Sequence, residues 1–217
     1  MVLKESLIKK IIREIIEDFM DEANYPSNFN MEEFKNLKSF AARLRYCKEN
    51  LQPIASGSGR YVFGIDADTV LKLAKNKKGV AQNETEYKFA NDSYITIVAE
   101  VFDVDENFLW IEMERLNKCT WKKFENITGI DSSDFNLALI YYYYKHLSRN
   151  NYFNQKPDTY DEIVENEFFQ DVVDLMANYD MPPGDLTKLS SWGITKTGEI
   201  KLIDAGLSQQ VYDTYYK

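Results

Sequence analysis

The sequence predicts an α+β fold, in which a small antiparallel sheet carrying one helix is followed by a mainly helical region. Three observations predict it. Helical periodicity dominates residues 3–50, β-branched and aromatic residues alternate with turn formers over residues 54–116, and helical periodicity returns from residue 120 before a final strand pair. With 217 residues and 44% hydrophobic content, the chain is long enough to bury a sizeable core.

The composition excludes several classes of protein. A net charge of −9 argues against a general nucleic-acid binder, because a phosphate backbone requires a basic face. Two cysteines, Cys47 and Cys119, are too few for a disulfide framework and indicate a reducing compartment. The single histidine, His146, cannot form a multi-histidine metal site. No apolar run approaches the ~20 residues that span a bilayer, and the first residues do not have the pattern of a signal peptide. We therefore expect a cytoplasmic protein without a membrane or nucleic-acid partner.

Residues 1–50 are expected to form an N-terminal helical extension. Apolar residues in "LKESLIKKIIREIIEDFM", residues 3–20, recur every three or four positions with charges between them. This stripe has two interpretations, which are packing on its own domain and docking of a partner or a second copy of the chain. Pro26 ends the helix, and a second helix is expected over residues 31–50, with Pro53 beyond it.

Residues 51–117 are expected to form a sheet with one helix, read as a five-strand meander. The turn signals "DAD" and "DEN" separate its strands. Its expected elements are strands at residues 60–65 and 69–74, a helix within 79–92, and strands within 94–105 and 107–116.

Residues 118–217 are expected to form a mainly helical lobe that ends in a β-hairpin. Its expected elements are helices at 120–127, 133–148 and 160–179 and a hairpin at 192–206 that turns at 196–198. Four tyrosines at residues 141–144 and His146 share one of these helices, and we interpret them as packing and surface residues.

A glycine-rich turn, "SGSG" at residues 56–59, opens a strand pair instead of a helix, so it is not a Walker A loop. Between strands, such a turn can lie over phosphates with its backbone N–H groups, because glycines permit close approach. An ordinary hairpin turn is the competing interpretation.

Lys72 lies in the apolar strand "VLKLA", where a lysine is costly unless it meets a negative group. Glu84 and Glu86 on the next helix are the candidate partners, and we choose Glu86 because it should lie one turn deeper. The competing interpretations are a lysine that snorkels out of an edge strand and glutamates that are solvated.

Taken in order, these motifs resemble the protein-kinase signature set. The strand lysine and helical glutamate are followed by "MERL" at residues 113–116, "GDL" at residues 184–186 and a hairpin ending in "DAG" at residues 204–206. The resemblance covers about residues 51–210 and implies a minimal protein-kinase-like fold of two lobes. More narrowly, the segments "LIKKIIREIIEDF", "VLKLAKNKKGVAQNETE" and "SSWGITKTGEIKLIDAGL" are similar to kinase-like proteins of tailed bacteriophages.

The resemblance implies a cleft for ATP and Mg²⁺ between the two lobes. In the family, the glutamate orients the lysine that holds the α- and β-phosphates, and the linker after the fifth strand receives adenine. The aspartate of the final hairpin binds Mg²⁺, and the aspartate of "GDL" accepts the proton of the substrate hydroxyl. On this sequence the implied catalytic residues are Asp185 and Lys72, the metal ligands are Asp204 and Ser191, and the cofactor-binding residues are Gly57, Ser58, Gly59, Arg60, Lys72, Glu86, Met113, Glu114 and Leu116.

The metal-binding part of the family pattern is incomplete. The asparagine that binds a second metal is missing, and Ser190 or Ser191 stands in its place. Counting back from Asp204 favours Ser191. A serine hydroxyl is a weaker metal ligand than an amide carbonyl, so we expect a reduced affinity for the metal.

Two other family positions are changed. Val62 stands at the third glycine of the loop, where Arg60 at the tip either contacts phosphate or faces solvent. Ala205 replaces the phenylalanine whose packing sets active and inactive states, so we expect that control to be absent.

Only eleven residues follow Gly206, too few for the activation segment and helical subdomain with which protein kinases hold a peptide. We therefore expect a substrate to be held elsewhere, by the helices of residues 118–180 or by the N-terminal extension.

Two functions follow from these residues. The first is an ATP- and Mg²⁺-dependent phosphotransferase, which the retained lysine, glutamate and two aspartates favour. The second is a pseudokinase that binds a nucleotide or a host or phage protein, which the missing asparagine and the altered glycine loop favour. Nucleotidyl transfer from ATP is a third.

Overall fold

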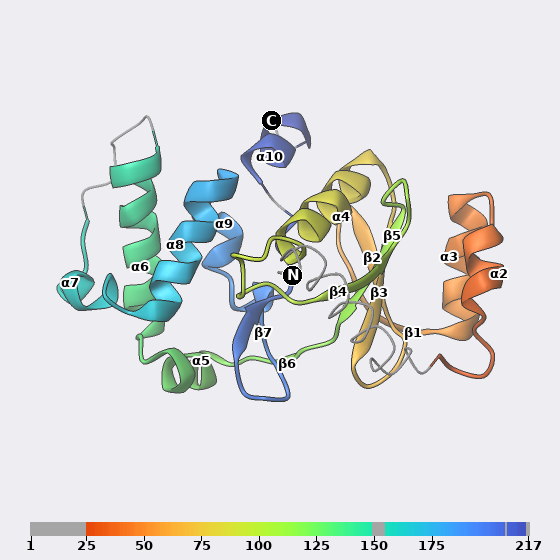
Figure 1. The fold of residues 1–217 in the computed structure, drawn as a ribbon, viewed down its shortest axis with the longest axis horizontal. Coiled ribbons are helices and arrows are strands. Elements are labelled where there is room, and N and C mark those ends of the chain that lie inside the picture. Colours follow the sequence, from red (N-terminus) through yellow and green to blue (C-terminus); the bar gives the residue numbers. More distant parts are fainter. Residues whose placement is uncertain (1–24, 149–154, 207, 216–217) are drawn as a thin grey trace, which may run out of the picture.

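A five-stranded antiparallel sheet and a helical lobe lie side by side in the structure, which is a computed structural model and describes residues 25–148, 155–206 and 208–215 (Figure 1). The strands of the sheet are β1 (Gln52–Ser56), β2 (Arg60–Gly64), β3 (Thr69–Ala74), β4 (Val101–Val104) and β5 (Trp110–Glu114). Their spatial order is β1-β2-β3-β5-β4, and helix α4 (Lys77–Ala90) follows β3 in the chain and packs on the sheet. This confirms the predicted α+β fold with a small antiparallel sheet that carries one helix.

Alternation along the central strand β3 assigns different neighbours to the two faces of the sheet. Leu71 and Leu73 belong to a core that the sheet shares with the N-terminal helices, whereas Val70 packs in a separate cluster with β5. Lys72 lies two residues after Val70 and therefore on the same face, and β3 is buried along its whole length. The lysine is thus fixed on the face that meets the helical lobe.

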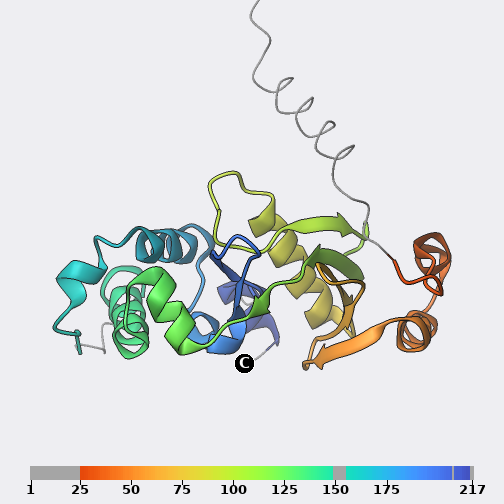
Figure 2. The ribbon, with the colours of Figure 1, turned by 90° about the horizontal axis from the view of Figure 1, so that it is seen from below.

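Helices α2 (Met31–Asn36) and α3 (Phe40–Asn50) pack at the far end of the sheet from the helical lobe (Figure 2). Phe34 and Cys47 are fully buried there, and the Phe34 ring lies 5.8 Å from that of Trp110, measured between centroids. The prediction of a single helix over residues 31–50 is wrong, because this segment forms two helices. Ser39 caps the second one by accepting a hydrogen bond from the backbone N–H of Ala42 at 3.2 Å. The helix predicted at residues 3–20 lies outside the described residues.

The second lobe is built around a cluster of buried aromatic side chains. Phe124, Phe135, Phe169 and Trp192 are each at most 2% exposed. Its helices are α5 (Trp121–Thr128), α6 (Ser132–Tyr142), the π-helix η1 (Tyr143–Leu147), α7 (Tyr160–Ile163), α8 (Glu167–Tyr179), α9 (Pro183–Leu186), the 3₁₀ turn η2 (Leu189–Ser191) and α10 (Gln209–Tyr215), and its strands are β6 (Asn117–Lys118), β7 (Trp192–Ile194) and β8 (Ile200–Leu202).

Two predicted helices of this lobe are interrupted. The helix predicted at residues 133–148 changes from α to π geometry at Tyr143, and the helix predicted at residues 160–179 is divided because Asn166 caps α8. The side chain of Asn166 accepts a hydrogen bond from the N–H of Phe169 at 3.2 Å. His146 is exposed on η1, as interpreted from the sequence.

Residues 97–99 connect the two lobes. The strand predicted from residue 94 begins only at Val101, because the preceding segment bonds to the final hairpin instead of the sheet. The backbone N–H of Leu202 donates to the carbonyl of Ile97 at 2.6 Å, and the N–H of Ala99 donates to the carbonyl of Leu202 at 3.0 Å. These bonds hold the end of β8 beside the sheet. Within the described residues, no helix has the length and hydropathy needed to cross a membrane.

Candidate functional site

A cavity of about 630 Å³ opens between the sheet and the second lobe, and its volume lies in the range of sites for small molecules. The residues that line it come from β1, β2 and the turn between them, from β3, α4, the end of β5 and the residues after it, and from α9, the segment after α9 and the segment after β8. They are Ile54, Ala55, Ser56, Gly57, Ser58, Gly59, Arg60, Val62, Val70, Lys72, Gln82, Met113, Glu114, Arg115, Leu116, Asp185, Lys188, Ser190, Ile203 and Asp204. Most of the residues predicted from the sequence are therefore in one place.

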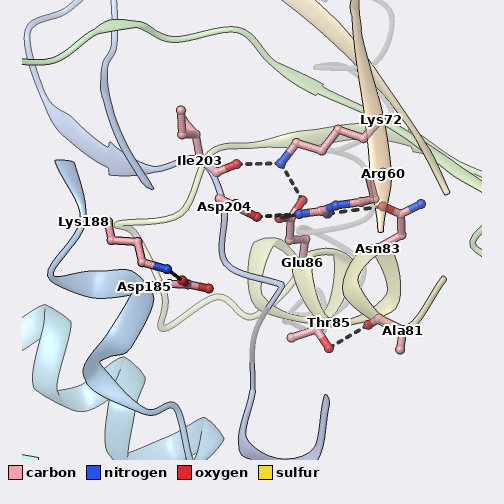
Figure 3. A network of polar contacts seen from close by, with 10 residues as sticks. All are labelled: Arg60, Lys72, Ala81, Asn83, Thr85, Glu86, Asp185, Lys188, Ile203 and Asp204. Atoms are coloured by element: carbon pink, nitrogen blue, oxygen red, sulfur yellow. Dashed lines mark hydrogen bonds and ion pairs between the residues drawn. The ribbon is translucent and has the colours of Figure 1, made fainter. Parts of the chain in front are cut away.

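Lys72 enters this cavity from β3 and has two partners (Figure 3). Its Nζ lies 2.8 Å from Oε2 of Glu86 and 2.6 Å from the carbonyl oxygen of Ile203. Lys72 is 5% exposed and Glu86 is fully buried. The lysine thus joins the sheet, helix α4 and the final hairpin through one ammonium group.

Helix α4 presents Glu86 to the sheet and Glu84 to the surface. Asn76 caps the helix by accepting a hydrogen bond from the N–H of Gly79, and Glu86 lies on the inward face with Asn83. Glu84 instead forms a surface pair with Lys88 at 2.7 Å. The structure therefore pairs Lys72 with the glutamate chosen from the sequence.

Burial and neighbouring charges shift the pKa values of both Glu86 and Lys72. Burial would raise the pKa of Glu86, but the charges of Arg60 and Lys72 outweigh burial and hold that pKa below its ordinary value. Burial lowers the pKa of Lys72, and Arg60 lowers it further, against the opposing effects of Glu86 and Asp204. Glu86 is therefore a carboxylate that stabilises two neighbouring cations.

Arg60 is buried at the start of β2 and contacts both sides of the cavity (Figure 3). One terminal nitrogen of its guanidinium lies 2.8 Å from Oε1 of Glu86 and 2.5 Å from Oδ1 of Asp204. The other donates to Oδ1 of Asn83 at 3.3 Å. The sequence left phosphate contact and solvent exposure open for this arginine, and the structure excludes exposure to solvent.

The glycine-rich turn closes one end of the cavity and is held by two lysines, one just before α4 and one in its first turn. The Nζ of Lys75 donates to Oγ of Ser56 at 2.7 Å, and the Nζ of Lys78 donates to Oγ of Ser58 at 2.7 Å. Gly57 and Gly59 line the cavity between these contacts. The turn is therefore attached to the helix that carries Glu86.

Asp204 and Gly206 follow β8 in the way that the sequence indicated. The side chain of Asp204 is 54% exposed, and it reaches the cavity from the second lobe, opposite Lys72. Gly206 lies against α4, where an added Cβ would be 2.7 Å from Cβ of Gln82. Close packing on the helix, and not a left-handed backbone, explains the glycine.

Asp185 lies at the same cavity, on helix α9. Its Oδ1 accepts a hydrogen bond from Nζ of Lys188 at 2.6 Å, and its side chain is 17% exposed (Figure 3). The indole N–H of Trp192 donates to the carbonyl oxygen of Leu186 at 2.8 Å, which fixes the residue next to Asp185 against the hairpin. The geometry leaves Asp185 accessible to a group bound in the cavity.

Ser190, not Ser191, lines the cavity. Ser191 is 3% exposed, and its carbonyl oxygen accepts the N–H of Ile203 at 2.7 Å. Ser191, the residue chosen from the sequence, instead joins the backbone of the hairpin. Met113, Glu114 and Leu116 line the opposite end, as the linker after the fifth strand was expected to do.

The donor set does not fit the Mg²⁺ that the resemblance implies. Mg²⁺ takes several hard oxygen ligands in octahedral geometry. Among the described residues, no group of three or more His, Cys, Asp or Glu side chains could hold a metal ion. At the cavity, Asp204 is paired with Arg60 and Asp185 is paired with Lys188. The aspartate to which the resemblance assigns the ion therefore already has a buried guanidinium as its partner.

Three residues of the site were not identified from the sequence. Asn83 is fully buried and orients the Arg60 guanidinium, while its own amide donates to the carbonyl of Phe108 at 2.9 Å. Lys188 pairs with Asp185, and Gln82 packs beneath Gly206. The position of Lys188 three residues after Asp185 was the one available signal.

No protein-family model matches the sequence, and no curated protein matches it. Among solved structures, it is similar to a GDP complex of an aminoglycoside 2′-phosphotransferase mutant, with 12% identity, a TM-score of 0.37 and coverage of 81% of this chain and 69% of the other. A choline/ethanolamine kinase family protein from Mesorhizobium loti shares 14% identity, with a TM-score of 0.38 and coverage of 77% and 65%. SAICAR synthase from Saccharomyces cerevisiae shares 15% identity, with a TM-score of 0.31 and coverage of 71% and 73%.

Proposed function

We propose that this protein binds ATP in the cavity between its lobes and transfers a phosphoryl group to a hydroxyl of a second substrate. One observation carries the proposal. Lys72 from the sheet and Asp204 from the final hairpin line the same cavity. Glu86 forms an ion pair with the lysine, and Asp185 lines the cavity from the second lobe. The same four residues were identified from the sequence by their resemblance to the kinase signature set.

Each residue has a part in this reaction. Lys72 and Arg60 supply the positive charge that the phosphates require, and Glu86 keeps both side chains in place. The end of β5 and the two residues after it, from Met113 to Leu116, receive the base. Asp185 accepts the proton of the attacking hydroxyl, for which it must lie within hydrogen-bond reach of the bound substrate.

Thermal unfolding with and without ATP tests the binding step. Wild type should be stabilised, because a ligand that binds only the folded state raises its stability. Lys72→Ala should lose this stabilisation, whereas Lys77→Ala, which removes an exposed lysine at the start of α4, should keep it. Equal stabilisation of wild type and Lys72→Ala would reject the assigned pocket.

Transfer of radiolabel from the γ-phosphate of ATP to components of a bacterial lysate tests the chemistry. Asp185→Asn should bind ATP as wild type does and transfer no label. Retained ATP binding without transfer in the wild type itself would instead support the pseudokinase prediction. A host or phage protein as the partner remains a prediction from the sequence.

A further inference from the structure

Arg60 contacts Asp204, the residue to which the resemblance assigns a metal ion. Its guanidinium bridges Glu86 and Asp204, at 2.8 Å and 2.5 Å, and it is 6% exposed. Asn83 accepts from its second terminal nitrogen at 3.3 Å. A side chain with three buried or partly buried acceptors is a fixed part of the site.

Among the described residues, four charged groups are linked through this guanidinium without an ion. Arg60 contacts the carboxylates of Glu86 and Asp204, and Lys72 contacts Glu86. A divalent cation at Asp204 would share the carboxylate with the guanidinium and repel it. Asp185, another acid that lines the cavity, is paired with Lys188.

The two acids that hold Arg60 differ in how firmly they are fixed. Glu86 is fully buried and is also bonded to Lys72, whereas the side chain of Asp204 is 54% exposed. Asp204 is therefore the partner that can leave when a phosphate arrives. Arg60 would remain anchored by Glu86 and Asn83, and its planar guanidinium matches phosphate oxygens.

We propose that Arg60 replaces the metal ion in this site, so that Arg60 and Lys72 together bind the phosphates of ATP and no divalent cation is needed for binding. The inference rests on the proposed function, since it concerns the same nucleotide. It predicts that Asp204 serves Arg60 and not Mg²⁺.

Calorimetric titration of the full chain with ATP tests the inference, once in excess EDTA and once in excess MgCl₂. Wild type should bind with dissociation constants that agree within about twofold. Binding in MgCl₂ alone would overturn the inference and leave the proposed function standing. The absence of ATP binding in both solutions would overturn both.

In contrast to wild type, variants at Arg60 should bind ATP with different affinities in EDTA and in MgCl₂. Arg60→Gln should lose about tenfold or more of its affinity for ATP in EDTA, because one of two phosphate-binding cations is gone. MgCl₂ should restore part of that affinity, since Asp204 is released. Arg45→Gln, which removes an exposed arginine on α3, is the matched control and should behave as wild type. Unchanged affinity of Arg60→Gln in EDTA would contradict the inference.

Paramagnetic Mn²⁺ supplies a readout without nucleotide. Water-proton relaxation should show no specific Mn²⁺ binding by wild type, binding by Arg60→Gln, and its loss in Arg60→Gln combined with Asp204→Asn. Binding by wild type that Asp204→Asn removes would overturn the inference. If Arg60→Gln fails to fold, Arg60→Lys tests the same point, because it keeps the charge, loses the planar fork and should weaken ATP binding in EDTA.

Discussion

The main chain of Gly79 lies directly against the carbonyl oxygen of Gly59. A methyl group on Gly79 would be 2.1 Å from that oxygen, which also accepts the N–H of Lys75 at 2.7 Å. This approach joins the glycine-rich turn to the first turn of the helix that carries Glu86. The backbones of the turn and the helix are therefore in direct contact, and only a residue without Cβ at position 79 permits this contact.

Gly79→Ala should destabilise the protein and weaken ATP binding. Replacing a glycine inside a helix ordinarily stabilises it by about 0.5–1 kcal/mol, but the collision with Gly59 should cost about 1–3 kcal/mol and displace the turn. Urea unfolding measures the first effect, and titration with ATP measures the second. Gly184→Ala is the control, since no atom lies within 4 Å of its added methyl group, and it should leave stability unchanged or raise it.

Glu86→Gln should be among the most destabilising single changes at the site. It leaves Lys72 and Arg60 buried next to each other without the carboxylate that both contact, and breaking a buried pair in this way costs about 3–5 kcal/mol. Glu84→Gln makes the same chemical change two residues earlier, in an exposed pair with Lys88, and should cost about 0.5 kcal/mol or less. Equal unfolding midpoints for the two variants would contradict the assignment.

Trp192→Phe should separate catalysis from nucleotide binding. The change keeps a ring in the aromatic core but removes the N–H that bonds to Leu186, which leaves a buried carbonyl unpaired at a cost of about 1–3 kcal/mol. Because Leu186 follows Asp185, we expect phosphoryl transfer to fall while ATP binding is kept. Trp121→Phe, a half-buried tryptophan that also contacts Phe124, should alter transfer less.

The sequence predicted the parts of the site that are set by local order along the chain. Lys72 was identified because a lysine interrupts an apolar strand, and Asp204 because an acid and a glycine end the final hairpin. Both observations depend on a few neighbouring residues. The alternation that buries Leu71 and Leu73 also fixes the direction of Lys72.

The position of Arg60 could not be predicted in this way. Its partners Glu86 and Asp204 lie 26 and 144 residues away in the chain, so the contact exists only when both lobes are assembled. A basic residue beside a glycine-rich turn is also common on exposed surfaces. Its role as a buried bridge is a property of tertiary structure.

The boundaries of the elements were wrong where a polar cap interrupts an apolar pattern. Ser39 and Asn166 each begin a new helix, although the apolar periodicity on either side continues. The sequence did not predict the bounds of strand β1, because Pro53 was interpreted as a signal that lies beyond the end of a helix. Proline is tolerated in this strand because β1 lies at the edge of the sheet.

Glu112 should make the stability of the protein depend on pH. It is 3% exposed on β5 and accepts a hydrogen bond from Tyr25 at 2.6 Å, and burial raises its pKa from 4.5 to about 7. Between these two pH values the folded state keeps a proton that the unfolded state has lost, so the free energy of unfolding falls as pH rises. The fall amounts to roughly 3 kcal/mol and is complete above about pH 7.

Glu112→Gln removes this titration, because the amide has no proton to lose and can still accept from Tyr25. Relative to wild type, the variant should therefore gain roughly 3 kcal/mol of stability between about pH 4 and about pH 8. Urea unfolding of both proteins across this range measures the difference. Glu114→Gln, the same change two residues along β5, should follow the wild-type pH dependence because Glu112 is intact. Parallel curves for wild type and Glu112→Gln would show that the pKa of this carboxyl is the same in the folded and unfolded states.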